Sequence, residues 1–180
     1  MTTMTANQPD PAATRAAERA DEFVQHLYGS GYDLFTGVPC GILSPLFAAL
    51  DAASEGFLYA PREDTAVALA AGAWLGGRRP LVVMQNSGLG QSVNALASLI
   101  VPYAVPLSMI VSLRGLPPDT TPENQVMGAL TEPILDGMGI PARRCGGADD
   151  LDWLAETTSA RGRPAALLVE PSYFSWSPAR

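Results

Sequence analysis

One carboxylate and one glycine-bearing stretch are the parts of this sequence best suited to chemistry. Glu63 precedes an alanine-rich apolar run that predicts a buried helix, and the exposed N–H groups and dipole at a helix start favour a negative charge. Glu63 would either cap that helix or, if Asp64 and Thr65 do the capping, point into a site. The polar stretch from Gln85 to Asn94 follows an apolar, β-branched run. This pattern predicts a buried strand followed by a ligand-binding loop and then a helix.

Two further segments carry residues that could take part in a site. Gly37-Val38-Pro39-Cys40-Gly41 reads as a tight loop after a short strand. Arg114 is the first charge after an uncharged span that begins beyond Arg79. It would either pair with an anionic substrate or mark the end of a strand. Cys40 would be a small packing residue or a nucleophile, and the sequence leaves its role open.

Several common chemistries are disfavoured by the spacing of these residues. Gly88 and Gly90 are not followed by the Lys-Ser/Thr of a phosphate-binding P-loop, and no third glycine completes a dinucleotide fingerprint. A nucleophilic Ser87 would need a histidine base, but the only histidine, His26, has no neighbour in the sequence that would orient it. The two cysteines, at 40 and 145, lack metal-ligand spacing.

Alternating strand and helix patterns place these residues in an α/β fold. Apolar runs predict six strands: 33–36, 57–59, 81–84, 106–113, 142–145 and 165–169. Helical periodicity lies between them, including a helix over 123–138 that Gly128 and Pro133 would break. The expectation is one three-layer domain with a six-stranded, mostly parallel sheet flanked by helices, and with ligands at the carboxyl ends of the strands. We assign a disordered tail to 1–11, the domain to 12–170 and a second tail to 171–180.

Composition narrows the partners of the chain. The 180 residues carry a net charge of −7, which argues against a grip on nucleic-acid phosphates. The uncharged segment 95–113 contains Pro102 and Pro106, so two buried strands around a helix explain it better than a membrane span does. No basic-then-apolar signal segment opens the sequence, and we expect a cytoplasmic protein.

Three strings in this sequence resemble one enzyme family. They are Phe35-Thr36-Gly37-Val38-Pro39, then Arg62-Glu63 before the alanine-rich helix, then Met84-Gln85-Asn86-Ser87-Gly88-Leu89-Gly90 with Asn94. Together they resemble the thiamine-diphosphate-dependent decarboxylases, and in particular the phosphonopyruvate and sulfopyruvate decarboxylase group. The resemblance covers roughly residues 15 to 170 and corresponds to the pyrimidine-binding (Pyr) domain of that family.

The resemblance implies a role for each matching residue. Glu63 corresponds to the glutamate that hydrogen-bonds N1′ of the cofactor's aminopyrimidine and so promotes removal of the thiazolium C2 proton. The remaining cofactor contacts would come from Gly37, Val38, Pro39, Ser87 and Gly88. The contacts to a small anionic 2-oxo acid would come from Gln85, Asn86 and Arg114.

One departure from the family pattern implies a partner. These enzymes bind the diphosphate through Mg²⁺ on a second domain (PP), which is marked by Gly-Asp-Gly, and this chain contains no Gly-Asp-Gly. Gly147-Ala148-Asp149 is not a substitute. The resemblance therefore implies the alpha subunit of a split enzyme, with the Mg²⁺ ligands on a separate beta subunit in a heterodimer or heterotetramer.

The substrate and the outcome of the reaction stay open. Cys40 stands where full-length phosphonopyruvate decarboxylases carry Asp, and the Glu123, Gln125, Gly128 spacing looks more like the sulfopyruvate type. Decarboxylation to an aldehyde and CO₂ is the main expectation. Carboligation through the same enamine intermediate and a non-catalytic regulatory subunit with this fold are the alternatives.

Overall fold

The fold is built on one six-stranded sheet whose strands all run parallel. The computed structural model describes residues 10–53 and 56–177. The strand order across the sheet is β2-β1-β3-β4-β6-β5. The strands are β1 (Leu34–Gly37), β2 (Leu58–Tyr59), β3 (Pro80–Gln85), β4 (Ser108–Ser112), β5 (Ala142–Arg144) and β6 (Ala165–Val169). The predicted α/β sandwich is confirmed.

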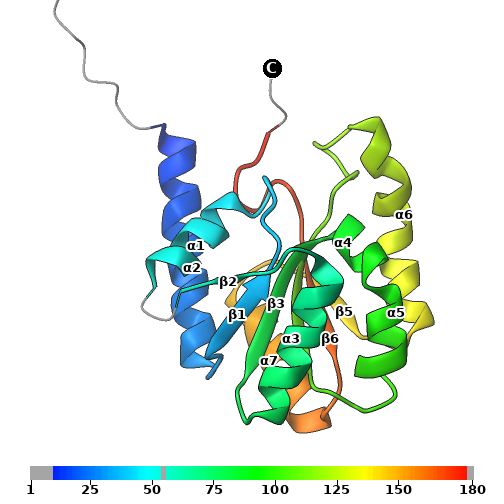
Figure 1. Cartoon of the computed structure of the whole chain (residues 1–180). Coiled ribbons are helices and arrows are strands. Elements are labelled where there is room, and N and C mark those ends of the chain that lie inside the picture. The colour runs from blue at the N-terminus through cyan, green and yellow to red at the C-terminus, as the bar shows by residue number, and fades with distance from the viewer. Residues whose placement is uncertain (1–9, 54–55, 178–180) are drawn as a thin grey trace, which may run out of the picture.

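Helices cover both faces of this sheet and form two separate cores (Figure 1). On one face lie α1 (Pro11–Gly29), α2 (Ser44–Ala52) and α7 (Ala148–Arg161). On the other lie α3 (Glu63–Leu75), α4 (Asn86–Gln91), α5 (Val93–Ala95), the π-helical turn η1 (Leu96–Ile100) and α6 (Pro122–Gly137). The carboxyl ends of the strands share the upper edge of the sheet in Figure 1. The loops singled out from the sequence therefore meet at that edge.

The uncharged span of the sequence lies at the centre of the fold. Strands β3 and β4 pair from Leu81↔Ser108 to Gln85↔Ser112, and nearly every side chain on them is buried. A strand covered on both faces needs apolar residues at every position rather than at alternate positions, which explains the missing charges. Within the described part of the chain, no helix is long and apolar enough to cross a membrane.

Two local predictions were wrong, and both involve glycines inside helices. The stretch predicted as a loop after β3 begins helix α4 directly at Asn86, and α6 runs unbroken through Gly128 and Pro133. A Cβ at Gly128 would lie 2.8 Å from the carbonyl oxygen of Gly115, so glycine is needed there for close packing. Pro133 removes one backbone hydrogen bond, but burial of Thr131 and Leu135 holds both halves of α6 in one helix.

The termini also differ from the prediction of two tails. Helix α1 begins at Pro11, and the Asp10 carboxylate caps it by accepting the Ala12 N–H at 2.9 Å. Residues 1–9 of the predicted N-terminal tail lie outside the described residues. At the other end, the chain turns after β6 and buries Phe174 in the core of the α1 face. Residues 171–177 are therefore packed on the domain.

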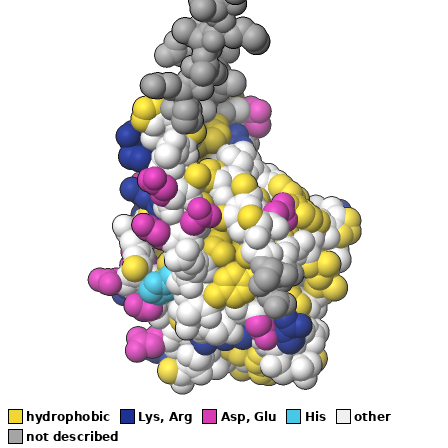
Figure 2. Space-filling view, turned by 90° about the vertical axis from the view of Figure 1, so that its left-hand side faces the viewer, with side chains coloured by type: hydrophobic (Ala, Val, Ile, Leu, Met, Phe, Trp, Pro, Cys, Tyr) yellow, Lys and Arg dark blue, Asp and Glu magenta, His cyan; other side chains and the backbone are white. Residues whose placement is uncertain are grey.

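The exposed side of helix α1 is rich in acidic residues. Glu18, Asp21 and Glu22 of α1 are exposed, and Figure 2 shows acidic side chains gathered there around the single histidine. His26 itself is half-buried, with Nε2 2.7 Å from Asp152 Oδ1 of α7. It is a hydrogen-bond partner of that aspartate at the surface.

Candidate functional site

The Glu63 carboxylate lies directly against the backbone of Gly88. A Cβ at Gly88 would lie 2.4 Å from Glu63 Oε1 and 2.3 Å from its Cγ, which is far inside van der Waals contact. Glu63 is the first residue of α3 and only 8% exposed. Two residues 25 positions apart in the sequence, both predicted to belong to the site, are thus in contact.

Glu63 does not cap its own helix, because neighbouring residues satisfy the local groups. Arg62 forms a two-pronged pair with Asp64, with nitrogen–oxygen distances of 3.0 and 3.1 Å, and Asp64 Oδ1 accepts the Thr65 N–H at 2.8 Å. Asp64 therefore provides the carboxylate that accepts a backbone N–H at the start of α3, and Glu63 is not needed for that role. This separates the two readings of Glu63 that the sequence left open.

Gln91 is the one protein donor to the Glu63 carboxylate among the described residues. With its amide oriented to satisfy both neighbours, its nitrogen donates to Glu63 Oε2 at 2.7 Å and its oxygen accepts from Arg62 Nη2 at 3.0 Å. An ionised carboxylate has about four acceptor positions. Glu63 therefore keeps acceptor capacity for a donor that is not part of this chain.

The loop after β1 crosses the end of β3. A Cβ at Gly37 would lie 1.8 Å from the carbonyl oxygen of Val83, so the two backbones approach as closely as they do only because residue 37 is glycine. Farther along the loop, Cys40 Sγ lies 3.3 Å from Ser112 Oγ at the end of β4. Val38 is half-buried and Pro39 is exposed, so both are near the surface of this edge.

The buried side chain of Asn86 forms hydrogen bonds within the domain. Its Nδ2 donates to the carbonyl oxygen of Arg114 at 2.9 Å and to Thr131 Oγ1 at 3.0 Å, which ties the end of β3 to the end of β4 and to α6. Its Oδ1 is buried without a hydrogen-bond partner in the described residues. The neighbouring Gln85 and Ser87 are more accessible, and Gln85 Nε2 donates to Ser87 Oγ.

Arg114 is held from two sides at the end of β4. Its Nε donates to Asp119 Oδ2 at 2.7 Å, and its Cζ lies 5.4 Å from the centre of the Trp176 ring. Burial alone would raise the pKa of Asp119, but hydrogen bonds from Thr121, Arg114 and the Gly115 N–H outweigh it and hold that pKa well below its usual range. The Arg114–Asp119 pair is therefore charged at neutral pH.

Curated relatives that this chain covers over nine-tenths of their length identify the family. The chain is 34% identical to sulfopyruvate decarboxylase subunit alpha of Methanothermobacter thermautotrophicus over 151 residues, covering 81% of this chain and 91% of that subunit. It is 32% identical to the subunit of the same name from Methanocaldococcus jannaschii, covering 83% and 92%. The chain belongs to the sulfopyruvate decarboxylase alpha-subunit family. No model in the scan of protein families matches it.

Longer relatives extend this family beyond separate subunits. Phosphonopyruvate decarboxylase of Streptomyces viridochromogenes is 39% identical over 119 residues, and the match spans 65% of this chain but only 30% of that protein. Among solved structures, 2-oxoglutarate:ferredoxin oxidoreductase from Magnetococcus marinus matches with a TM-score of 0.68 and 13% identity, covering 91% of this chain and 31% of that one. The family fold thus occurs within larger chains.

Three residues at the carboxyl edge of the sheet were not predicted from the sequence: Gln91, Asp119 and Trp176. Gln91 lies three positions after Gly88, so a helical reading of 86–91 would have placed both on one face, next to Glu63. Trp176 lies in the predicted C-terminal tail, and no local pattern in the sequence connects it with Arg114. Burial raises the pKa of Cys145 to about 11, so that thiol is a packing group rather than a nucleophile.

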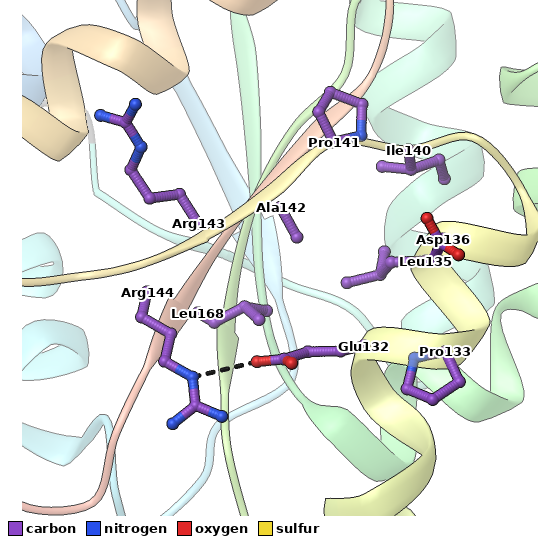
Figure 3. Close-up of a pocket in the computed structure, with 10 residues that line it drawn as sticks. All are labelled: Glu132, Pro133, Leu135, Asp136, Ile140, Pro141, Ala142, Arg143, Arg144 and Leu168. Atoms are coloured by element: carbon purple, nitrogen blue, oxygen red, sulfur yellow. Dashed lines mark hydrogen bonds and ion pairs between the residues drawn. The ribbon is translucent and has the colours of Figure 1, made fainter.

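The pocket of about 630 Å³ shown in Figure 3 is separate from the residues around Glu63 and Arg114. It is formed between α6 and the edge strand β5. Arg144 crosses it to Glu132 at 3.0 Å and also pairs with Glu170 at 2.7 Å. These ion pairs are exposed and contribute little to stability. None of the site residues predicted from the sequence lines this pocket, so its size alone does not mark it as the functional site.

Proposed function

We propose that residues 12–170 are the pyrimidine-binding domain of a two-component, thiamine-diphosphate-dependent decarboxylase acting on sulfopyruvate or phosphonopyruvate. The products would be the corresponding aldehyde and CO₂. The observation that carries this proposal is the buried Glu63 carboxylate, which rests against Gly88 and retains acceptor capacity. Relatives named as decarboxylase alpha subunits, covered over nine-tenths of their length, support it.

The residues at the upper edge of the sheet fit the pyrimidine half of this cofactor. Glu63 would accept a hydrogen bond from the protonated N1′ of the aminopyrimidine, and a charge-assisted bond of this kind is worth most where water is excluded. The bare backbone at Gly37 and Gly88, with Val38, Pro39 and Ser87, would line the ring. When bound, thiamine diphosphate supplies the electron sink on which a 2-oxo acid loses CO₂.

Arg114 is our candidate for the strongly acidic group of the substrate. It is charged, and no protein acceptor among residues 10–53 and 56–177 bonds to its two terminal nitrogens. Gln85 would contribute a further polar contact. Asn86 would act mainly through Arg114, since its amide fixes the Arg114 carbonyl.

A separate beta subunit would supply the diphosphate site. No group of three His, Cys, Asp or Glu side chains in the described residues could hold a metal ion, so we assign the Mg²⁺ ligands to that partner. Exposed apolar side chains on α3, η1 and α6 and in the turn after η1 suit burial beneath it in a heterodimer or heterotetramer. They are Leu69, Leu75, Leu99, Tyr103, Val126 and Leu130.

The state of the two cysteines bears on the cellular compartment. Cys40 and Cys145 are both free thiols and both buried. Unpaired cysteines are typical of a reducing environment. We propose a cytoplasmic enzyme.

The test is reconstitution with the candidate partner. The pair should release CO₂ from sulfopyruvate or phosphonopyruvate only when thiamine diphosphate and Mg²⁺ are present. Activity of the lone chain, or cofactor-independent activity of the pair, would overturn the proposal. Product analysis with and without an added aldehyde separates decarboxylation from carboligation. An unchanged rate after Glu63→Gln would favour a non-catalytic subunit.

A further inference from the structure

The C-terminal segment turns back over the carboxyl edge of the sheet. The turn is anchored by backbone bonds from Tyr173 N to the Glu170 carbonyl at 3.0 Å and from Trp176 N to the Pro171 carbonyl at 3.1 Å. Phe174 is buried, with its ring 6.0 Å from that of Phe23 on α1. In Figure 1 this red segment rises beside the loop that follows β1. The segment has a defined position on the domain.

Strand order explains why this turn reaches Arg114. Strands β4 and β6 are neighbours in register, with Ser112 opposite Val169, and the Leu113 N–H donates to the Val169 carbonyl at 2.9 Å. Arg114 and the C-terminal turn therefore leave the sheet side by side. The Trp176 ring lies over the Arg114 guanidinium, and its Nε1 would lie 3.6 Å from a Cβ placed at Gly41.

The two neighbours of Arg114 constrain different motions of its side chain. Asp119, whose side chain is fully buried, binds Nε and fixes one edge of the guanidinium. A single bond at Nε still leaves the plane free to tilt, and the indole on its face limits that tilt. A planar guanidinium binds a tetrahedral oxyanion through two parallel N–H bonds only when its plane is correctly oriented.

We propose that Trp176 is a positioning residue, which orients the terminal nitrogens of Arg114 toward the acidic β-substituent of the substrate. The C-terminal turn is then one wall of the substrate pocket. This inference rests on the proposed function and adds to it the means by which a sulfonate or phosphonate is distinguished from an uncharged methyl group. An indole over a partly buried cation contributes enough for about a tenfold change in binding when it is lost.

The experiment uses the assembled complex of both subunits with thiamine diphosphate and Mg²⁺. KM and kcat are measured for sulfopyruvate and phosphonopyruvate, and the constant for pyruvate is measured by competition. Trp176→Ala should raise KM for the acid that the wild-type complex uses about tenfold, with kcat and the pyruvate constant within twofold of wild type. Trp176→Phe keeps an aromatic face and should restore most of the affinity.

Trp153→Ala is the matched control. Trp153 on α7 also lies against an arginine, with its ring centre 4.8 Å from Cζ of Arg143, but Arg143 belongs to the edge strand β5 and not to the proposed site. It should leave both constants unchanged. Trp176→Leu preserves bulk without a π-face and should behave like the alanine variant, which keeps the test valid if alanine prevents folding.

Three results would overturn the inference. They are an unchanged KM in Trp176→Ala and Trp176→Leu, an equal loss of affinity for pyruvate, or the same effect in Trp153→Ala. If the wild-type complex decarboxylates neither acid, the proposed function itself fails, and the two failures are thus distinguishable.

Discussion

Replacing Gly88 by alanine would place a methyl group where the Glu63 side chain now lies. The new Cβ would lie 2.3 Å from Glu63 Cγ, 2.5 Å from Cδ and 2.4 Å from Oε1. Non-bonded carbons pack at about 3.5–4.0 Å, so the carboxylate would have to move by about 1 Å. The obstruction includes Cγ, which is close to the backbone of α3, so rotation of the far end of the side chain cannot relieve it.

The structural cost of this change should be small and its catalytic cost large. Overpacking costs about 1–3 kcal/mol of unfolding free energy, and alanine in a helix recovers about 0.5–1 kcal/mol. A displacement of about 1 Å of a group that must meet a cofactor atom can lower kcat about 100-fold. We therefore expect Gly88→Ala to fold and assemble but to decarboxylate poorly.

The assay pairs urea unfolding of the chain with the kcat of the reconstituted complex at saturating thiamine diphosphate. Gly137→Ala is the control, because a Cβ at that helical glycine has open space around it. It should leave kcat unchanged and should raise the unfolding free energy by no more than about 0.5–1 kcal/mol. Full kcat in Gly88→Ala would refute the placement of Glu63 at the reacting end of the cofactor. Loss of activity only in proportion to loss of folded protein would do the same.

Three further substitutions test separate parts of the site. Glu63→Gln should lower kcat of the complex about 100-fold or more, since it removes the charge from the hydrogen bond proposed to the cofactor. Thermal stability should change little, because the new amide oxygen can still accept from Gln91; an activity near wild type contradicts this prediction. Asn86→Ala should lower the unfolding free energy of the lone chain by about 1–3 kcal/mol, because buried partners at Thr131 and Arg114 lose their donor; urea unfolding measures it. The folded-state pKa of Asp119 is depressed, so the stability this carboxylate contributes is fully present above its unfolded pKa of about 3.9 and is lost as the pH falls through the folded value. Asp119→Asn should therefore destabilise the chain at pH 7 and reduce the loss of stability between pH 7 and pH 3, and an unchanged difference would exclude this role.

The sheet could be predicted from the sequence because a strand that is buried on both faces consists of consecutive apolar residues, as in Leu81–Met84 and Ala165–Val169. The prediction from the sequence was wrong where glycine can have either of two structural roles. Gly88 and Gly90 read as loop residues, but in α4 they are small so that Glu63 and Met127 can approach the helix. That requirement comes from residues far away in the chain, and no local propensity contains it.

The chain order explains both the site that was predicted and the residue that was missed. From β1 the chain moves outward to β2 through α2, then returns across to β3 through α3, which covers the opposite face. Ligands of parallel sheets bind at such a reversal of strand order, and here it brings Glu63, at the start of α3, to the loop that begins at Gly37. Those residues lie on successive connections, so an alternating pattern suffices to bring them together. Trp176 instead follows β6, and it reaches Gly41 and Arg114 only because β6 inserts beside β4 with β5 outside it. The order of strands beyond the reversal cannot be predicted from the spacing of residues in the sequence, so the contact between Trp176 and Arg114 could be found only from the structure.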